Sequence, residues 1–166
     1  MKSWIKLSVA IFIFSALVPL QFIFAQSVPA DFVKLFYYRD GKKAWESFQK
    51  NIKSIDVIAP QTYSVKADGE IKGGLTDDFL ALAKKNNIKI MPLLTNSSFS
   101  QQDIHDILDN PNVQDKIIQA MIVEAQKEGY WGWQFDFEQM MADYRDKYST
   151  FVRRAYPEFQ KNNLVF

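Results

Sequence analysis

The spacing of hydrophobic and polar residues changes repeatedly along the chain, and each change predicts a new element. Short runs of β-branched and aromatic residues, typical of strands, alternate with stretches whose apolar positions recur every three or four residues, typical of amphipathic helices. The predicted strands cover residues 32–38, 55–62, 88–94 and 130–138, and a fifth begins at 164–166. The predicted helices cover residues 43–53, 76–85, 100–108, 111–129 and 144–155. Strict alternation of this kind predicts parallel strands joined by right-handed crossovers.

Residues with a known preference for helix ends and turns support these boundaries. Thr76 and Ser100 are suited to the N-cap position, and Gly129 is suited to the position after a helix. Pro157 is expected to close the last helix, and residues 67–70, Ala-Asp-Gly-Glu, predict the tip of a small hairpin.

These elements predict the α/β class and a (β/α)8 TIM barrel of which about the first four βα units are present. A complete barrel needs about 250 residues, whereas the chain has 166. The first and fourth strands would then have unpaired edges, which favour association with other strands. We therefore expect a truncated gene product or partial reading frame, and an open doubly wound domain is the alternative.

The fourth predicted strand separates its side chains into two chemically different faces. Its aromatic face contains Trp131, Trp133, Phe135 and Phe137. Its polar face contains Gln134, Asp136 and Glu138. The two carboxylates are roughly 7 Å apart along a strand, and like charges so placed are unfavourable unless one is protonated or both have partners. Because such a pair is costly for stability alone, it indicates a chemical role, and a solvated strand face is the alternative.

Residues 129–138, Gly-Tyr-Trp-Gly-Trp-Gln-Phe-Asp-Phe-Glu, resemble the strand-four signature of glycoside hydrolase family 18, the chitinase-like family, written DGxDxDxE. Asp136 and Glu138 match its last two acids, and Gly132 matches its glycine. Trp131 and Gln134 replace its first and second aspartates. The resemblance is strongest to the branch related to spore-germination, cortex-lytic enzymes, in which the middle acid is often an amide.

This resemblance implies hydrolysis of β-1,4 glycosidic bonds in polymers that contain N-acetylglucosamine, such as chitin or peptidoglycan. Glu138 is then the general acid. The 2-acetamido group of the substrate attacks the anomeric carbon, and Asp136 orients that group, so the retaining reaction needs no protein nucleophile. No cofactor or metal is implied. The alternatives are a non-catalytic carbohydrate-binding protein on the same scaffold and an inactive fragment.

Function in a barrel lies at the carboxyl ends of the strands, and polar or aromatic side chains end several of the predicted strands. The candidates for substrate binding are Gln134, Tyr63, Gln61, Asn96 and Tyr38. Turn residues of the same types are common in loops, and of the adjacent tyrosines at positions 37 and 38 at most one is expected to face the site.

The first 25 residues predict a signal peptide, because Lys2 and Lys6 precede an apolar run that ends at Ala25. An uncleaved membrane anchor is the alternative. Residues 26–166 then form the partial barrel domain, secreted or located in the periplasm or cell envelope, with no stable membrane insertion after cleavage.

Composition limits the partners of residues 26–166. Once the two leader lysines are removed, 18 basic and 19 acidic residues remain, which is one net negative charge. This balance argues against nucleic acid as a partner and suits an uncharged polysaccharide. The chain has no cysteine, so no disulfide supports the fold. His105 is the only histidine, and it has no carboxylates at metal-ligand spacing, so we expect a structural role for it.

Overall fold

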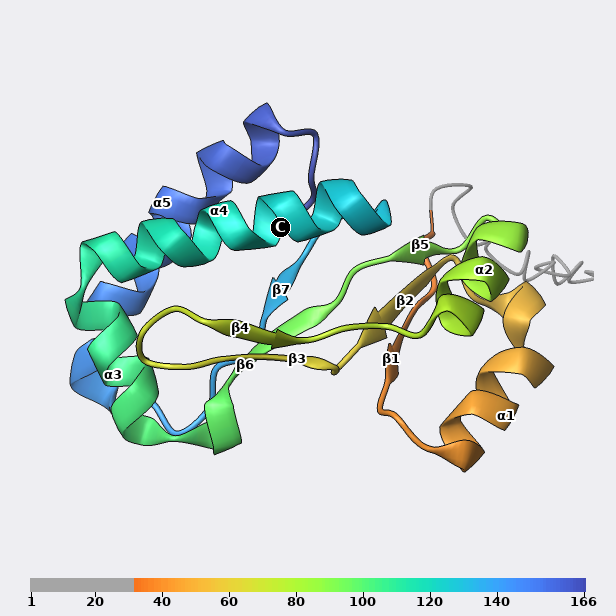
Figure 1. Ribbon diagram of the computed structural model, residues 1–166, viewed down its shortest axis with the longest axis horizontal. Helices are drawn as coiled ribbons and strands as arrows, with labels where there is room; N and C mark the ends of the chain where they lie inside the picture. The colour runs from red at the N-terminus through yellow and green to blue at the C-terminus, as the bar shows by residue number, and fades with distance from the viewer. Residues whose placement is uncertain (1–31) are drawn as a thin grey trace, which may run out of the picture. The chain divides into compact units, whose positions relative to one another are not determined.

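The computed structural model describes residues 32–166, of which Val33–Phe166 form one compact unit (Figure 1). The predicted signal peptide, residues 1–25, and the alternative of an uncleaved anchor lie outside the described residues. Within residues 32–166, every helix is too short or too polar to cross a membrane.

The strands form two groups of hydrogen-bonded neighbours. The first group has the order β1-β2-β5, is parallel throughout, and consists of β1 (Leu35–Tyr38), β2 (Val57–Pro60) and β5 (Lys89–Ile90). The second has the order β4-β3-β6-β7 and consists of β3 (Tyr63–Val65), β4 (Ile71–Gly73), β6 (Leu93–Asn96) and β7 (Gln134–Phe135). In the second group β3, β6 and β7 are parallel, and β4 pairs antiparallel with β3 as the predicted hairpin.

Both groups belong to the same succession of strands, because β2 continues into β3 and β5 continues into β6. Gln61, between β2 and β3, still donates its backbone N–H to Tyr38 O of β1 at 2.8 Å. At the other end, Val165 forms a parallel bridge with Gly132, so the predicted fifth strand begins beside the fourth. Neighbours in space therefore follow chain order without the reversal of a doubly wound sheet, and the α/β fold of barrel type is confirmed.

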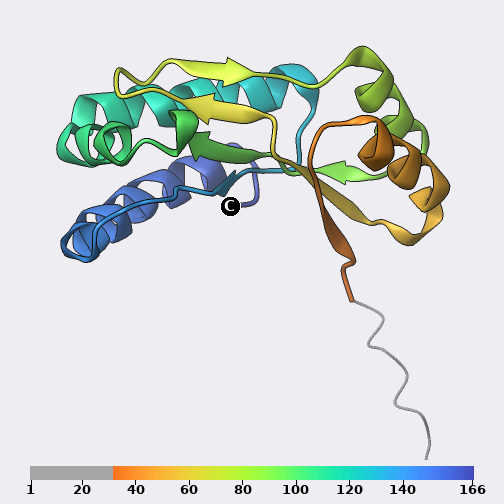
Figure 2. The ribbon, with the colours of Figure 1, turned by 90° about the horizontal axis from the view of Figure 1, so that it is seen from below.

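Five α-helices accompany the strands within the described residues. They are α1 (Lys42–Lys50), α2 (Asp77–Lys85), α3 (Gln101–Asp109), α4 (Pro111–Glu128) and α5 (Arg145–Lys161). Three short 3-10 helices cover Ile52–Ser54, Ser97–Phe99 and Ala142–Tyr144. Figures 1 and 2 show α1 and α2 beside β1 and β2, whereas α3, α4 and α5 lie beside β3, β6 and β7.

The helix ends predicted from Thr76, Ser100 and Gly129 are confirmed. Thr76 Oγ1 accepts the N–H of Phe79 at 3.3 Å, and Gly129 ends α4 in the left-handed region at φ 75°. Pro157, however, lies inside α5, so the prediction that it closes the helix is wrong. A proline removes one helical hydrogen bond, but continuation of α5 places Phe159 in the core, where it is fully buried.

The core lies between the strands and the helices and is rich in aromatic rings. Trp133, Phe151 and Phe159 are its largest fully buried side chains. The Trp133 indole N–H donates to Met121 O of α4 at 2.9 Å, so the buried polar atom of this ring has a partner. The fourth strand is therefore attached to α4 through Trp133, one residue of its predicted aromatic face.

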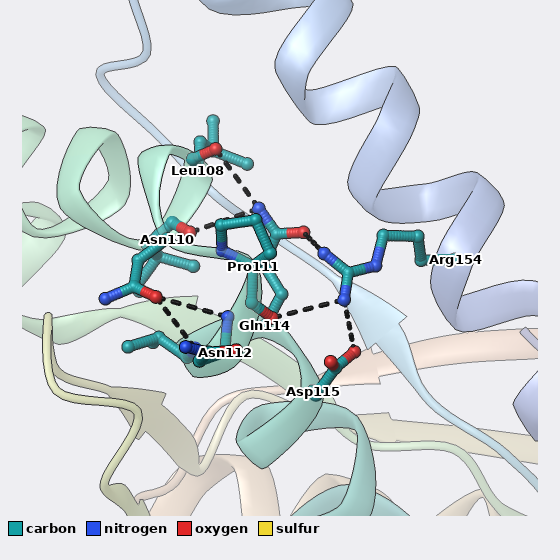
Figure 3. A network of polar contacts seen from close by, with 9 residues as sticks. Leu108, Asn110, Pro111, Asn112, Gln114, Asp115 and Arg154 are labelled. Carbon is teal, nitrogen blue, oxygen red and sulfur yellow. Dashed lines mark hydrogen bonds and ion pairs between the residues drawn. The ribbon is translucent and has the colours of Figure 1, made fainter.

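A buried glutamine connects α3, α4 and α5 (Figure 3). Gln114 of α4, only 3% exposed, donates its amide N–H groups to Ile107 O at 3.2 Å and Leu108 O at 3.1 Å, carbonyls of the last turn of α3. Its amide oxygen accepts Arg154 Nη1 of α5 at 2.9 Å, and the same guanidinium contacts Asp115. These bonds fix the helices that support β6 and β7.

Candidate active site

The carboxyl ends of the first, second and fourth strands surround a hollow of about 360 Å³. Its lining includes Tyr37 and Tyr38 of β1, Arg39 after β1, Gln61 after β2, and Gln134 and Asp136 of the fourth strand. The volume falls within the range of about 300–1,000 Å³ typical of small-ligand clefts. The structure thus brings together four of the residues predicted for the site: Gln61, Gln134, Asp136 and Tyr38.

Asp136 is held by a side chain from a neighbouring strand. Gln61 Nε2 donates to Asp136 Oδ2 at 2.9 Å, across 75 positions of sequence. The negative charge of Asp136 is also felt by Tyr148 of α5, whose pKa is raised mainly by burial and further by this carboxylate. The orientation of Asp136 is therefore fixed by an uncharged donor, which leaves its other oxygen available for a ligand.

Gln134, which replaces the second aspartate of the motif, bonds to other partners than Asp136. Its Oε1 accepts the Tyr37 hydroxyl at 3.3 Å, and its Nε2 donates to Met91 O at 3.3 Å. Both halves of the amide are engaged, so Gln134 connects the first, third and fourth strands at the floor of the hollow.

Glu138 is exposed and does not line the hollow, whereas Phe135 and Phe137 pack against the core. Its backbone is held by Asn96 at the end of β6. Asn96 Oδ1 accepts Glu138 N at 2.9 Å, and Asn96 Nδ2 donates to Glu138 O at 3.2 Å and to Ser100 O at 2.8 Å. Asn96 is 1% exposed, so it is a support for the segment that carries Glu138, and the prediction that it contacts substrate is not supported by this position.

Both adjacent tyrosines line the hollow, but they differ in exposure. Tyr37 is 69% exposed, whereas Tyr38 is 7% exposed and packs against Phe79, with ring centroids 5.0 Å apart. Tyr38 therefore stays a predicted substrate-binding residue whose side chain is largely buried, and Tyr37 is the more accessible of the two. Alternation along β1 places the two rings on opposite faces of the strand, and the sequence does not indicate which of the two rings is the buried one.

Tyr63 lies on the helix-covered side, so its prediction as a substrate-binding residue is corrected. Its hydroxyl is 3.0 Å from Glu124 Oε1 of α4 and 2.7 Å from the hydroxyl of Tyr130. Burial raises the pKa of Tyr63 above its ordinary range, and burial raises the pKa of Tyr130 to about 12. Neither phenol is ionised at neutral pH, and the pair is part of the core.

An extra residue between β2 and β3 explains this placement. Ile58 pairs with Ile90, but Tyr63 pairs with Leu94, so five steps on the second strand face four on the third. Such a bulge reverses the alternation of side chains. Gln61 therefore points into the hollow, while Tyr63, two positions later, points to α4.

Trp131 similarly departs from the aromatic face predicted for the fourth strand. It is absent from the core cluster that contains Trp133, and Lys89 Nζ lies 4.3 Å from its ring centroid. Trp131 N donates to Ile90 O, and Gln134 N donates to Pro92 O. Three residue steps on the fourth strand therefore face two on the third strand, which indicates another bulge. Regular pairing is consequently limited to Gln134–Phe135 within the predicted strand.

Residues 32–166 contain no group of three or more histidine, aspartate or glutamate side chains placed to hold a metal ion. His105 is buried on α3, with its ring stacked on Tyr144 at a centroid distance of 3.6 Å. The hollow itself presents one carboxylate, Asp136, and the amides of Gln61 and Gln134, which are hydrogen-bonding groups.

Comparison with known proteins agrees with this geometry. The chain is 23% identical to the "uncharacterized glycosylase YvbX" of Bacillus subtilis over 169 aligned positions, which cover 99% of the chain and 48% of YvbX. The fold matches the spore cortex-lytic enzyme SleL of Bacillus megaterium with a TM-score of 0.73 and 23% identity, covering 80% of the chain and 33% of SleL. It matches a chitinase from Chromobacterium violaceum with a TM-score of 0.72 and 18% identity, covering 80% and 43% respectively. No protein-family model matches the chain.

The chain thus spans about half the length of YvbX and less than half of these two enzymes. Its fold is that of the corresponding part of chitinase-like barrels, and the resemblance predicted from residues 129–138 is confirmed.

Proposed function

We propose that the chain provides the acid-bearing half of an exported family-18-type glycoside hydrolase that cleaves β-1,4 bonds in a polymer containing N-acetylglucosamine. The observation that carries this proposal is the convergence of Gln61, Asp136 and Tyr37 at the carboxyl ends of three strands. The exposed Glu138 follows Asp136 by two positions. The similarity to a glycosylase and to cortex-lytic and chitinase structures supports it.

Glu138 is the general acid in the proposed reaction. Its carboxyl proton passes to the oxygen of the leaving sugar while the bond between that oxygen and the anomeric carbon breaks. The carbonyl oxygen of the substrate's own 2-acetamido group forms a bond to the same carbon, so the enzyme supplies no nucleophile. Water then opens this cyclic intermediate, and the carboxylate of Glu138 takes the proton from that water.

Asp136 orients the acetamido group and balances the positive charge that develops on it. A carboxylate can accept the acetamido N–H only if its oxygens are correctly placed, and the bond from Gln61 fixes one of them. Preorganised charge of this kind requires no rearrangement during the reaction. Tyr37, more than two-thirds exposed beside Gln134, offers an aromatic surface for a sugar ring.

A second candidate is a carbohydrate-binding protein without catalytic activity. The engagement of Gln134 with Tyr37 and Met91 favours it, because this amide cannot share a proton with Asp136 as the acid of the family motif would. Binding of the same polymer by the same hollow is common to both candidates.

Turnover of a chromogenic chitobioside and of cell-wall sacculi tests the proposal. Glu138→Gln is expected to lower kcat at least 100-fold with little change in KM, because general acid catalysis contributes about 10²–10⁴-fold. Glu158→Gln is the matched control, since Glu158 is on α5 and pairs with Lys161. Equal turnover by the Glu138 variant and the control would remove Glu138 from the mechanism. Binding of N-acetylglucosamine oligomers without turnover by the unaltered chain would favour the second candidate.

A further inference from the structure

The backbone that follows Glu138 is held by side chains and not by regular secondary structure. Residues 138–141, here called the Glu138 loop, receive bonds from three side chains. Asn96 binds Glu138 N and O, and Gln101 Nε2 donates to Gln139 O at 2.9 Å. Gln139 has φ 63°, a conformation that costs energy for a residue other than glycine. The loop therefore keeps its shape through these side chains together with one backbone bond, from Tyr144 N to Met141 O at 3.0 Å.

The third of these side chains is His105, the only histidine of the chain. Its Nε2 accepts the backbone N–H of Met141 at 3.3 Å. The ring is 8% exposed and lies parallel to the Tyr144 ring, with an interplanar angle of 5°. Nε2 can accept this bond only when it carries no proton, so the neutral ring has its proton on Nδ1. A doubly protonated imidazole has two donors and no acceptor, and its Nε2–H would then face the Met141 N–H.

We propose that His105 is a positioning residue for Glu138, and that its protonation releases the Glu138 loop. The neutral ring holds Met141, three residues after the acid, while Asn96 holds the acid's own backbone. Loss of the Met141 N–H bond leaves this strained segment held by Asn96 and Gln101 near its start and by the backbone bond from Tyr144 N to Met141 O at its end. The importance of this device for catalysis rests on the proposed function, whereas the response of the loop to pH does not.

The charged groups that face His105 come from its own helix and from α5. Asp109 lies one turn further along α3. The pKa of Asp109 is held below its ordinary value, first by a hydrogen bond from Lys147 and then by one from Tyr144. Lys147 of α5 lies with Nζ 4.2 Å from the centroid of the Tyr144 ring, which stacks on His105. The charges of Asp109 and Lys147 pair with each other.

A chain with one histidine permits a direct test. The imidazole Cε1–H resonance gives the titration of His105, and amide hydrogen exchange, corrected for its intrinsic pH dependence, gives the protection of Met141. We expect this protection to fall at least tenfold as the imidazole becomes protonated, with the same midpoint. Protection that stays constant through the titration would overturn the proposal, and this measurement needs no variant and no enzymatic activity.

Two variants separate the acceptor atom from the aromatic ring. His105→Gln retains an acceptor oxygen at similar reach but does not titrate, so Met141 is expected to remain protected at both pH 5 and pH 8. His105→Phe retains the ring against Tyr144 but has no acceptor, so Met141 is expected to be unprotected at both. Wild-type protection in the phenylalanine variant would show that packing alone holds the loop, and would also overturn the proposal.

Catalysis provides a separate readout. If turnover is observed, kcat of the wild-type chain should fall as pH is lowered, together with the protection of Met141. In His105→Gln the fall in kcat should occur at lower pH, with KM unchanged. A pH profile identical in wild type and His105→Gln would contradict the positioning role. Failure of the Glu138→Gln test would instead contradict the proposed function while leaving the exchange result intact.

Discussion

Replacing Asn96 with aspartate exchanges the side-chain NH2 group for an oxygen beneath the Glu138 loop. In the native chain the amide nitrogen donates to Ser100 O and Glu138 O, and the amide oxygen accepts from Glu138 N. The introduced carboxyl keeps the acceptor. It presents its second oxygen to two carbonyl oxygens, at a position that is 1% exposed in the native chain.

The cost of this exchange depends on pH. When the introduced carboxyl is protonated, its single O–H satisfies one of the two carbonyls, so we expect a loss of about 1–2 kcal/mol for the other. When it is ionised, burial and the facing carbonyls disfavour the charge, which raises its folded-state pKa above the unfolded value of about 3.9. A raised folded-state pKa contributes stability that is lost as pH increases. The deficit should therefore grow by about 1.4 kcal/mol for each unit by which the pKa is raised.

Urea unfolding at pH 5 and pH 8, followed by tryptophan fluorescence, measures this deficit, because Trp133 is fully buried. Asn112→Asp is the matched control, since Asn112 is exposed in the first turn of α4, where a negative charge is neutral or slightly favourable. We expect Asn96→Asp to be less stable than the control at pH 5 and still less stable at pH 8. Equal stability of the two variants, or a deficit that shrinks as pH rises, would refute the structural role assigned to Asn96.

Two further substitutions test the support of the site. Gln114→Met removes the partner of two α3 carbonyls and of Arg154, and it should lower the free energy of unfolding by about 2–3 kcal/mol. Asp115→Ala breaks only a partly exposed ion pair of the same network and should lower it by about 0–1 kcal/mol. Urea unfolding measures both losses, and equal losses would contradict this ranking. Gly132→Ala should lose about 1–3 kcal/mol, because a Cβ there would lie 2.0 Å from Val165 O; a melting temperature unchanged from wild type would show that the bridge is not close-packed.

Much of the fold could be predicted because the helix signals are local. Thr76, Ser100 and Gly129 cap helices as their sequence positions indicate, and the apolar spacing of α4 places Ile117 and Met121 in the core. Pro157 was misleading because its local preference is outweighed by the burial of the residues that follow it. Tertiary packing of this kind is not visible in a window of a few residues.

The site could be predicted only in part, because its geometry depends on strand register. Asp136 and Gln61 were identified from strand ends, and both lie at the hollow. Tyr63 has the same parity as Gln61 in the sequence, yet one inserted residue turns it to the opposite face. Pro60 indicates that regular pairing ends nearby, but it does not indicate an insertion. Gln101 was missed because it is an ordinary exposed helix residue until the Glu138 loop is placed beside it.

The departure from the family motif at position 134 is matched by its surroundings. The side chain there donates to a backbone carbonyl, Met91 O, and accepts from a hydroxyl, that of Tyr37. An amide satisfies both partners, whereas an ionised aspartate could satisfy only the hydroxyl and would place an oxygen toward the carbonyl. Asp136 receives its own donor from Gln61 on another strand. The amides of Gln134 and Gln61 therefore have complementary roles: Gln134 satisfies its own two partners, and Gln61 orients Asp136 without a proton shared along the fourth strand.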